Sequence, residues 1–159
     1  MKVWVVAVGR PGRLIGRAIE EYEARAGRYW KLHVQTVRQE STRGRTEDEV
    51  RNREANRLLE RLPDRAEIVA LTRAGEAMDS LQLARYLTSL ADSASPGAAF
   101  LIGGAYGLGE RALEAAQRRL RLSKFTLPHD IARLALAEQL YRAGTIIRGE
   151  PYHKGGVVR

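Results

Sequence analysis

Apolar and polar positions along the chain follow two alternating periods, which predict short strands separated by helices. The stretch 2–8 is a nearly continuous apolar run, as expected of a buried strand, and 30–37 alternates as a second strand would. Between them, the stretch 14–26 places apolar side chains at helical spacing along one stripe. The chain therefore begins with a strand, a helix and a second strand.

The same alternation continues beyond a polar, basic stretch at 40–45, which is predicted to be a mobile loop. Thr46 is followed three residues later by Glu49, the capping-box pattern that begins a helix, here running to about residue 62. The remaining predicted elements are strands at 67–72, 98–102 and 120–123, and helices at 79–92 (capped by Asp79 or Ser80), 109–119 and 129–143.

Strands that alternate with helices predict an open α/β fold with a mainly parallel sheet flanked by helices. The chain has no internal repeat, low-complexity segment or linker, so residues 1–159 are expected to form a single domain. Sheets of this kind bind ligands beyond the carboxyl ends of their strands. That rule directs attention to the ends of the strands at 67–72 and 98–102 and to the segment after 120–123.

The composition narrows the possible functions only in part. The net charge of +8 favours a polyanionic partner, although an arginine-rich proteome would explain it equally well. The absence of cysteine excludes disulfides and thiolate chemistry, and three scattered histidines argue against a metal site. No apolar segment approaches the roughly 20 residues that span a bilayer, so a cytoplasmic protein without membrane contact is expected. His33 lies within a predicted strand and is expected to be structural.

Paired glycines form the first candidate site. Gly103 and Gly104, with Gly107 three residues on, follow an apolar strand and would let the backbone approach a ligand closely. The spacing matches neither the dinucleotide fingerprint nor a Walker loop. A plain strand-to-helix turn explains these glycines equally well.

Two further segments combine chemically active side chains. The segment 122–129 mixes small, polar and apolar residues before a helix and, taken alone, is typical of a connecting loop. The C-terminal tail brings together Tyr152, His153 and Lys154, which could stack on a base and contact phosphate. His153 could also transfer a proton near neutral pH. Tails usually fray, so this cluster is not specific by itself.

Taken in this order, these segments resemble the ribosomal RNA large-subunit methyltransferase H family of SPOUT-class enzymes. The resemblance covers essentially the whole chain and is densest over residues 100–154. Each element is unspecific alone, but the ordered set is specific. The elements are Gly103-Gly104-x-x-Gly107, Leu122-Ser123-x-x-Thr126-Leu127-Pro128-His129, Arg133, Glu138-x-x-Tyr141-Arg142-Ala143 and Pro151-Tyr152-His153-Lys154.

The resemblance implies an enzyme that methylates N3 of a pseudouridine in 23S ribosomal RNA on the assembled ribosome, with S-adenosylmethionine as methyl donor. It also implies a C-terminal trefoil knot, with the knot and cofactor site mainly within 71–154, and a homodimer that the helix 129–143 helps to form. The residues it assigns to the cofactor are Leu71, Gly103, Leu122, Ser123, Lys124, Phe125, Thr126 and Leu127. Those it assigns to the reaction are Arg142, Tyr152, His153 and Lys154, among which the proton acceptor stays open.

The chain departs from the family at two places, and other interpretations stay open. Residues 155–159 extend beyond the point where the family usually stops, and Tyr106 occupies a variable position and receives no role. One alternative is a SPOUT methyltransferase that modifies transfer RNA or another ribosomal base. Another is a non-catalytic ribosome-binding factor that has kept the knot. A nucleotide-dependent oxidoreductase is disfavoured because its phosphate loop is missing.

Overall fold

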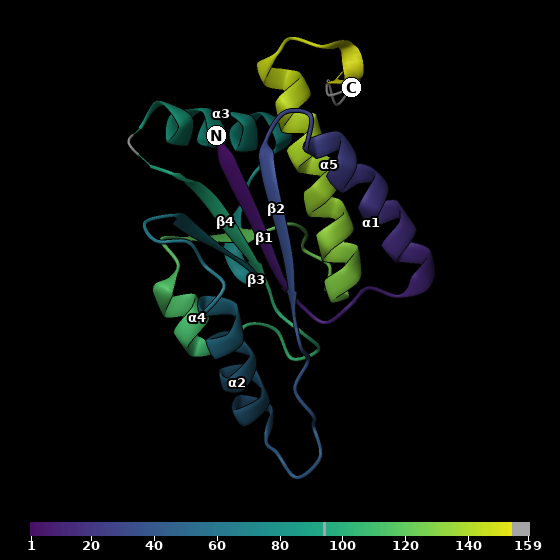
Figure 1. Cartoon of the computed structure of the whole chain (residues 1–159), viewed down its shortest axis with the longest axis vertical. Helices are drawn as coiled ribbons and strands as arrows, with labels where there is room; N and C mark the ends of the chain where they lie inside the picture. The colour runs from purple at the N-terminus through teal and green to yellow at the C-terminus, as the bar shows by residue number, and fades with distance from the viewer. Residues whose placement is uncertain (94, 154–159) are drawn as a thin grey trace.

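The computed structural model describes residues 1–93 and 95–153. Five strands form one sheet in the order β2-β1-β4-β3-β5, and each neighbouring pair is parallel. The parallel α/β sheet expected from the alternation is therefore confirmed. The strands are β1 (Lys2–Val8), β2 (Lys31–Val37), β3 (Glu67–Ala77), β4 (Gly97–Ile102) and β5 (Arg118–Arg121) (Figure 1).

Helices cover both faces of the sheet. Successive side chains of a strand point to opposite faces, so Val5 and Phe100 face one layer whereas Val6 and Leu101 face the other. The first layer contains α1 (Arg13–Ala26), α3 (Ser80–Asp92) and α5 (His129–Ile147), and the second contains α2 (Glu47–Leu59) and α4 (Glu110–Ala115) (Figure 1). A short 3-10 helix, η1 (Pro151–His153), follows α5. Burial on both faces explains why β1 and β4 are continuous apolar runs.

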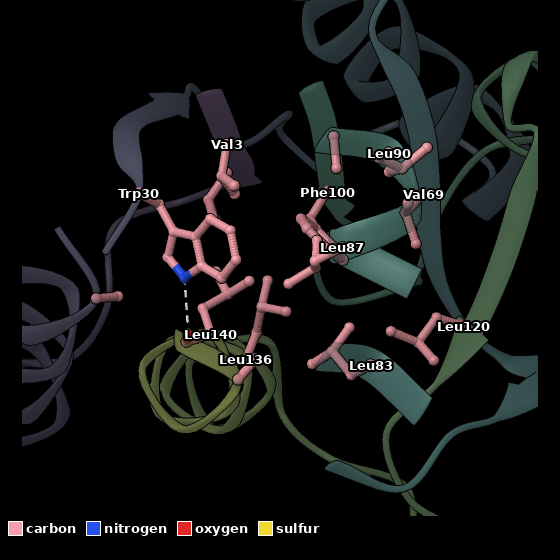
Figure 2. Packing of buried hydrophobic residues seen from close by; sticks show 14 of the residues in the cluster. Val3, Trp30, Val69, Leu83, Leu87, Leu90, Phe100, Leu120, Leu136 and Leu140 are labelled. Carbon is pink, nitrogen blue, oxygen red and sulfur yellow. Dashed lines mark hydrogen bonds between the residues drawn. The ribbon is translucent and has the colours of Figure 1, made fainter. Parts of the chain in front are cut away.

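The larger core layer joins the beginning of the chain to its last long helix. Figure 2 shows Phe100 of β4 among leucines from α3 and α5, with Trp30 closing one side. The indole Nε1 of Trp30 donates a hydrogen bond of 2.8 Å to the backbone carbonyl of Leu140. A buried tryptophan needs a partner for this N–H, so the bond fixes α5 against the start of β2. On the opposite face of the sheet, His33 stacks on Trp4 with ring centroids 5.6 Å apart, as expected of a structural histidine.

Two helix starts follow the predicted capping chemistry. The side chain of Thr46 accepts from the backbone N–H of Glu49, and the Glu49 side chain accepts in return from the Thr46 backbone. Asp79 and Gln82 form the same reciprocal arrangement at the start of α3. Such boxes satisfy amides that a helix N-terminus leaves unpaired. The helix that Thr46 caps ends at Leu59, slightly before the predicted position near residue 62.

The prediction that the third strand ends at residue 72 was wrong. Strand β3 continues to Ala77 because, after an irregularity between Leu71 and Glu76, it pairs with β5 a second time. Gly75 allows the close approach: a Cβ there would lie 2.6 Å from the backbone carbonyl carbon of Leu120. No atom fits at that distance, so glycine is required where the two strands meet.

Three other predicted boundaries also differ. Helix α4 ends at Ala115 rather than 119, and β5 spans 118–121 rather than 120–123, because Arg118 already pairs with Val69 of β3. Helix α5 extends to Ile147 rather than 143. It continues through Gly144 because that residue packs directly on the Tyr29 side chain, where a Cβ would clash. The trefoil knot and the single-domain organisation stay predictions.

Candidate functional site

A pocket lies where the middle of β3, at residues 71–73, and the carboxyl end of β4 meet the segment before α5. Its volume is about 960 Å³, within the range of small-molecule sites. A smaller pocket of about 90 Å³ shares Leu71 and Leu127 with it and continues toward Leu122. Both occupy the edge of the sheet that the general rule for parallel α/β folds indicates. We refer to the two together as the strand-end pocket.

A tight glycine turn forms one wall of this pocket. The N–H of Gly107 donates to the carbonyl of Gly104 at 3.0 Å, and Gly107 has a φ of +80°. A Cβ on Gly103 would lie 2.6 Å from both the Gly107 carbonyl oxygen and the Leu108 nitrogen. The turn therefore requires glycine at 103 for space and at 107 for backbone conformation.

The segment between β5 and α5 forms the opposite wall. The guanidinium of Arg73, beyond the first part of β3, donates to the hydroxyl of Thr126. The backbone N–H of Phe125 donates to Ser123 Oγ at 2.9 Å, which makes the segment turn on itself. The Phe125 ring is 82% exposed. These contacts hold the segment against the end of β3.

Most residues predicted to bind the cofactor gather in this place. The strand-end pocket is lined by Leu71, Gly103, Leu122, Ser123, Phe125, Thr126 and Leu127, among others. Lys124 is exposed and lines neither part of the pocket. Tyr106, to which the sequence assigned no role, contributes to the wall beside the glycine turn.

The residues predicted to act on the substrate form a separate cluster on α5 and η1. The Tyr152 hydroxyl donates to Glu138 Oε1 at 3.0 Å, and Arg142 Nη2 lies 2.6 Å from the same oxygen. The Arg142 guanidinium also lies over the Tyr152 ring, 4.8 Å from its centroid, and the ring packs against Tyr141. Lys154 and the side chain of His153 lie outside the described residues.

This environment determines the protonation of Tyr152. Burial and the hydrogen bond to Glu138 raise the pKa of the Tyr152 phenol to about 12. The same carboxylate raises the pKa of Arg142 through its hydrogen bond, which offsets the effect of burial. Near neutral pH, Tyr152 is therefore a neutral hydrogen-bond donor and Arg142 is a cation. The cluster can orient and neutralise an electron-rich ligand.

A second pocket of about 630 Å³ lies beside this cluster, between α3, α5 and the end of β5. Glu138 lines it, together with apolar side chains such as Ile131 and Leu134. Leu122 belongs both to this pocket and to the strand-end pocket. Neither Arg142 nor Tyr152 is among the residues lining the strand-end pocket. Within one chain, the Arg142 and Tyr152 side chains thus line neither pocket, and of their cluster only Glu138 borders the second one.

Sequence reasoning missed a pair of buried carboxylates below the glycine turn. Glu54 on α2 is 2% exposed, and its Oε1 has no hydrogen-bond partner among the described residues. Its Oε2 accepts from the backbone N–H of Glu40 at 3.1 Å. Glu40, also buried, forms ion pairs with Arg57 and Arg45. A signal was present: Glu54 occupies the same helical stripe as the buried Val50 and Leu58.

The pKa values of the two carboxylates shift in opposite directions. Burial raises the pKa of Glu54, and the attraction of Arg57 only partly offsets it. Burial also acts on Glu40, but there the N–H of Ser41 and the guanidinium of Arg57 prevail and hold its pKa below the usual range. Glu54 therefore carries its charge at a cost to stability, whereas the charge on Glu40 is stabilising.

We expect Glu54→Gln to raise the free energy of unfolding by about 1 kcal/mol at pH 8, because a neutral amide replaces a carboxylate that is charged in a buried position. The gain should shrink as pH falls through the raised pKa of the folded state, where the wild-type carboxyl is also neutral. Denaturant unfolding at several pH values measures it. Glu40→Gln is the control of opposite sign: it should destabilise at pH 8, with the deficit lost below the lowered pKa. A Glu54→Gln variant less stable than wild type at pH 8 would contradict this account.

The part of the chain that the structure describes contains neither a metal-binding cluster nor a helix that could span a membrane. Within residues 1–93 and 95–153, no group of three or more His, Asp or Glu side chains could hold a metal ion. None of the helices described there has the length and apolar character needed to cross a bilayer.

Comparison with known proteins identifies the class of enzymes to which this chain belongs. The chain belongs to the SPOUT methyltransferase family: the family model described as "Predicted SPOUT methyltransferase" matches residues 1–153. Within that class, its relatives are named ribosomal RNA large subunit methyltransferase H. The one from Gemmatimonas aurantiaca is 52% identical over 155 residues, covering 97% of this chain and 100% of the relative. The one from Geotalea daltonii is 40% identical over 154 residues, covering 96% and 99%.

Solved structures support the same fold. A probable methyltransferase from Bordetella pertussis matches with a TM-score of 0.56 at 15% identity, covering 89% of this chain and 95% of that one. A probable methylase family protein from Haemophilus influenzae gives a TM-score of 0.52 at 12% identity, covering 96% and 70%. The sequence relatives establish the family predicted from the motifs, and these structures establish its fold.

Proposed function

We propose that the protein transfers a methyl group from S-adenosylmethionine to N3 of a pseudouridine in 23S ribosomal RNA, on the assembled ribosome. The observation that carries the proposal is the strand-end pocket, formed by the glycine turn and the segment 122–127 in a chain whose full-length relatives are named large-subunit methyltransferases. Such a substrate would place the reaction in the cytoplasm, with the ribosomes.

The residues of the strand-end pocket fit such a cofactor. Its volume of about 960 Å³ admits a nucleoside with an amino-acid side chain. Leu71 and Leu127 offer apolar contacts for the faces of an adenine, and Gly103 and Gly104 have no side chain to keep the ligand from the backbone. Backbone groups of the segment 122–127 would supply hydrogen bonds to the base edge.

The chain's own residues would serve mainly to align the substrate. When bound, S-adenosylmethionine supplies a methyl group that is already activated, so no strong protein nucleophile is required. Arg142 would neutralise a phosphate or the negative charge that develops on the base. Tyr152, a neutral phenol because of its raised pKa and already donating to Glu138, would orient the base rather than accept its proton. His153 is thus the better proton acceptor for N3.

A homodimer would bring the two sets of residues together. In one chain, the Glu138, Arg142 and Tyr152 cluster does not line the strand-end pocket. The neighbouring 630 Å³ pocket exposes apolar residues of α5, among them Ile131 and Leu134. Such a surface suits contact with a second copy, and pairing through α5 would complete each site with residues of the partner subunit.

The decisive experiment is transfer of a labelled methyl group from S-adenosylmethionine to ribosomes that lack the modification, with free ribosomal RNA and transfer RNA alongside. Label in a 23S pseudouridine, obtained only with assembled ribosomes, is the expected result. Label in transfer RNA or in another base would mean that the proposed substrate is wrong, and failure to bind the cofactor would overturn the proposal.

In the same assay, His153→Ala should lower kcat at saturating ribosome concentration. Undiminished turnover would mean that His153 takes no part in the chemistry.

A further inference from the structure

The β2–α2 loop, residues 38–46, projects past the end of the sheet (Figure 1). Glu47 and Asp48, which follow it, line the strand-end pocket. The loop contains no apolar side chain and three arginines. Arg38 and Arg43 are exposed, and neither has an acidic side chain within 4.0 Å among the described residues. Two such cations on a projecting segment form a surface that suits an anionic partner.

The loop is anchored at its base by buried charge instead of apolar packing. The Glu40 carboxylate accepts from the Ser41 N–H at 3.2 Å and pairs with Arg57 and Arg45. Arg57 also donates to the backbone carbonyl of Arg38 at 2.8 Å. Glu40 thus engages Arg45 and Arg57 at the base of the loop, while Arg38 and Arg43 stay exposed.

Glu54 connects this anchor to the cofactor side. One oxygen of its carboxylate accepts from the Glu40 N–H, at the base of the loop. The other lies under the glycine turn, 2.9 Å from where a Cβ of Gly104 would be. A single buried side chain therefore touches both the base of the loop and the wall of the strand-end pocket. Their relative position is set by packing, since neither contact is exposed.

Exposed arginines also lie at the edge of the sheet from which the loop projects. Arg10 follows β1 at the same edge of the sheet and is exposed, as is Arg73 in the middle of β3. The acidic residues of the first turn of α2 are engaged locally: Glu47 and Asp48 pair with Arg51, and Glu49 closes the capping box. Cations and carboxylates therefore lie together at this edge, where Glu47, Asp48 and Glu110 line the strand-end pocket beside Arg51 and Arg73.

We propose that the β2–α2 loop binds the phosphate backbone of the substrate RNA beside the target nucleotide, through Arg38 and Arg43, and that Glu40 is the positioning residue that holds it there. This inference rests on the proposed function, because it takes ribosomal RNA as the substrate. Guanidinium groups bind phosphate in a bidentate manner, and each such contact releases counterions. The loop would therefore supply affinity without reading sequence.

The test compares two double variants of equal charge. Arg38→Ala/Arg43→Ala removes the proposed contacts, whereas Arg61→Ala/Arg85→Ala removes two exposed arginines at the end of α2 and on α3. Binding to ribosomes that lack the modification is measured over a range of salt concentrations. The loop variant should bind at least tenfold more weakly, and its slope of log K against log salt should fall by about 0.7 to 0.9 for each lost phosphate contact. The control should keep the wild-type affinity and slope within error.

Several outcomes would overturn the proposal. Equal behaviour of the two variants would remove the loop from the interface. Weaker binding with an unchanged salt slope would mean that the loop contacts a ribosomal protein instead of RNA. Cofactor affinity, measured by calorimetry, should stay unchanged in the loop variant, and KM for ribosomes should rise without a change in kcat. If the wild-type protein bound ribosomes but transferred no methyl group, only the proposed function would be wrong. The binding measurements would still test the role of the loop.

The positioning role has its own variant. Glu40→Gln keeps the size of the side chain and both exposed arginines but loses the carboxylate that pairs with Arg45 and Arg57. Measured below its melting temperature, it should raise KM for ribosomes while leaving cofactor affinity and kcat at wild-type values. Wild-type KM in this variant would show that the loop needs no such anchor.

Discussion

Ending the chain after Glu150 should abolish methyl transfer, by at least a thousandfold in kcat/KM, while cofactor affinity stays within about twofold of wild type. The shortened chain loses Tyr152, His153 and Lys154, which are proposed to hold the base and accept its proton. A loss of this size equals about 4 kcal/mol of transition-state stabilisation. Cofactor affinity should persist because the strand-end pocket is lined by residues before position 133.

Labelled-methyl transfer and calorimetric titration of S-adenosylmethionine measure the two effects, at a temperature where both proteins are folded. Loss of the Tyr152 contacts with Tyr141 and Glu138 should lower the melting temperature slightly. The matched control ends after Lys154 and should keep nearly full activity. If that control were as inactive as the shorter chain, the essential residues would lie in 155–159 and the role given to the Tyr-His-Lys cluster would be wrong.

Gly103→Ala should weaken S-adenosylmethionine binding at least a hundredfold, or about 2.7 kcal/mol. The added Cβ would lie 2.6 Å from the Gly107 carbonyl oxygen and the Leu108 nitrogen. Both are backbone atoms of the turn itself, so the clash cannot be relieved by rotating a side chain. The turn must open, which displaces one wall of the strand-end pocket.

The matched control is Gly16→Ala in α1, where a Cβ would meet Pro11 Cγ at 3.6 Å, an ordinary contact. Alanine inside a helix is favoured over glycine, so this variant should be more stable by roughly 0.5–1 kcal/mol and bind the cofactor normally. Calorimetry gives the affinities, and a melting curve shows whether each variant is folded. A folded Gly103→Ala protein with wild-type affinity would show that the turn does not form the cofactor site.

Local patterns predicted the order of elements well because they depend on nearby residues. Apolar periodicity located β1 and β4, and the capping boxes at Thr46 and Asp79 located the starts of two helices. The second half of β3 escaped prediction because its residues are mostly polar or small. It is a strand only because Gly75 lets the backbone of β5 come close. Tertiary contact decided that boundary.

In the candidate site, too, features set by nearby residues were predicted and features set by tertiary contact were missed. The glycines and the segment 122–127 were identified from their order along the chain, and the structure gathers them, except Lys124, around one pocket. Glu40 and Glu54 were missed because carboxylates usually face solvent, and only the fold reveals the arginines that compensate Glu40. The distance between the Tyr152 cluster and the pocket was equally inaccessible, since it depends on how α5 crosses the sheet.

The order of the strands has a consequence for how the protein is made. Strand β1 lies between β2 and β4, so the first strand to leave the ribosome waits for β4 before its second edge is paired. The bond from Trp30 to Leu140 joins residues 110 positions apart. A nascent chain must therefore keep an apolar sheet face uncovered until α5 emerges. Such long-range topology folds slowly, so we expect folding to finish after synthesis, with chaperones protecting the unfinished chain.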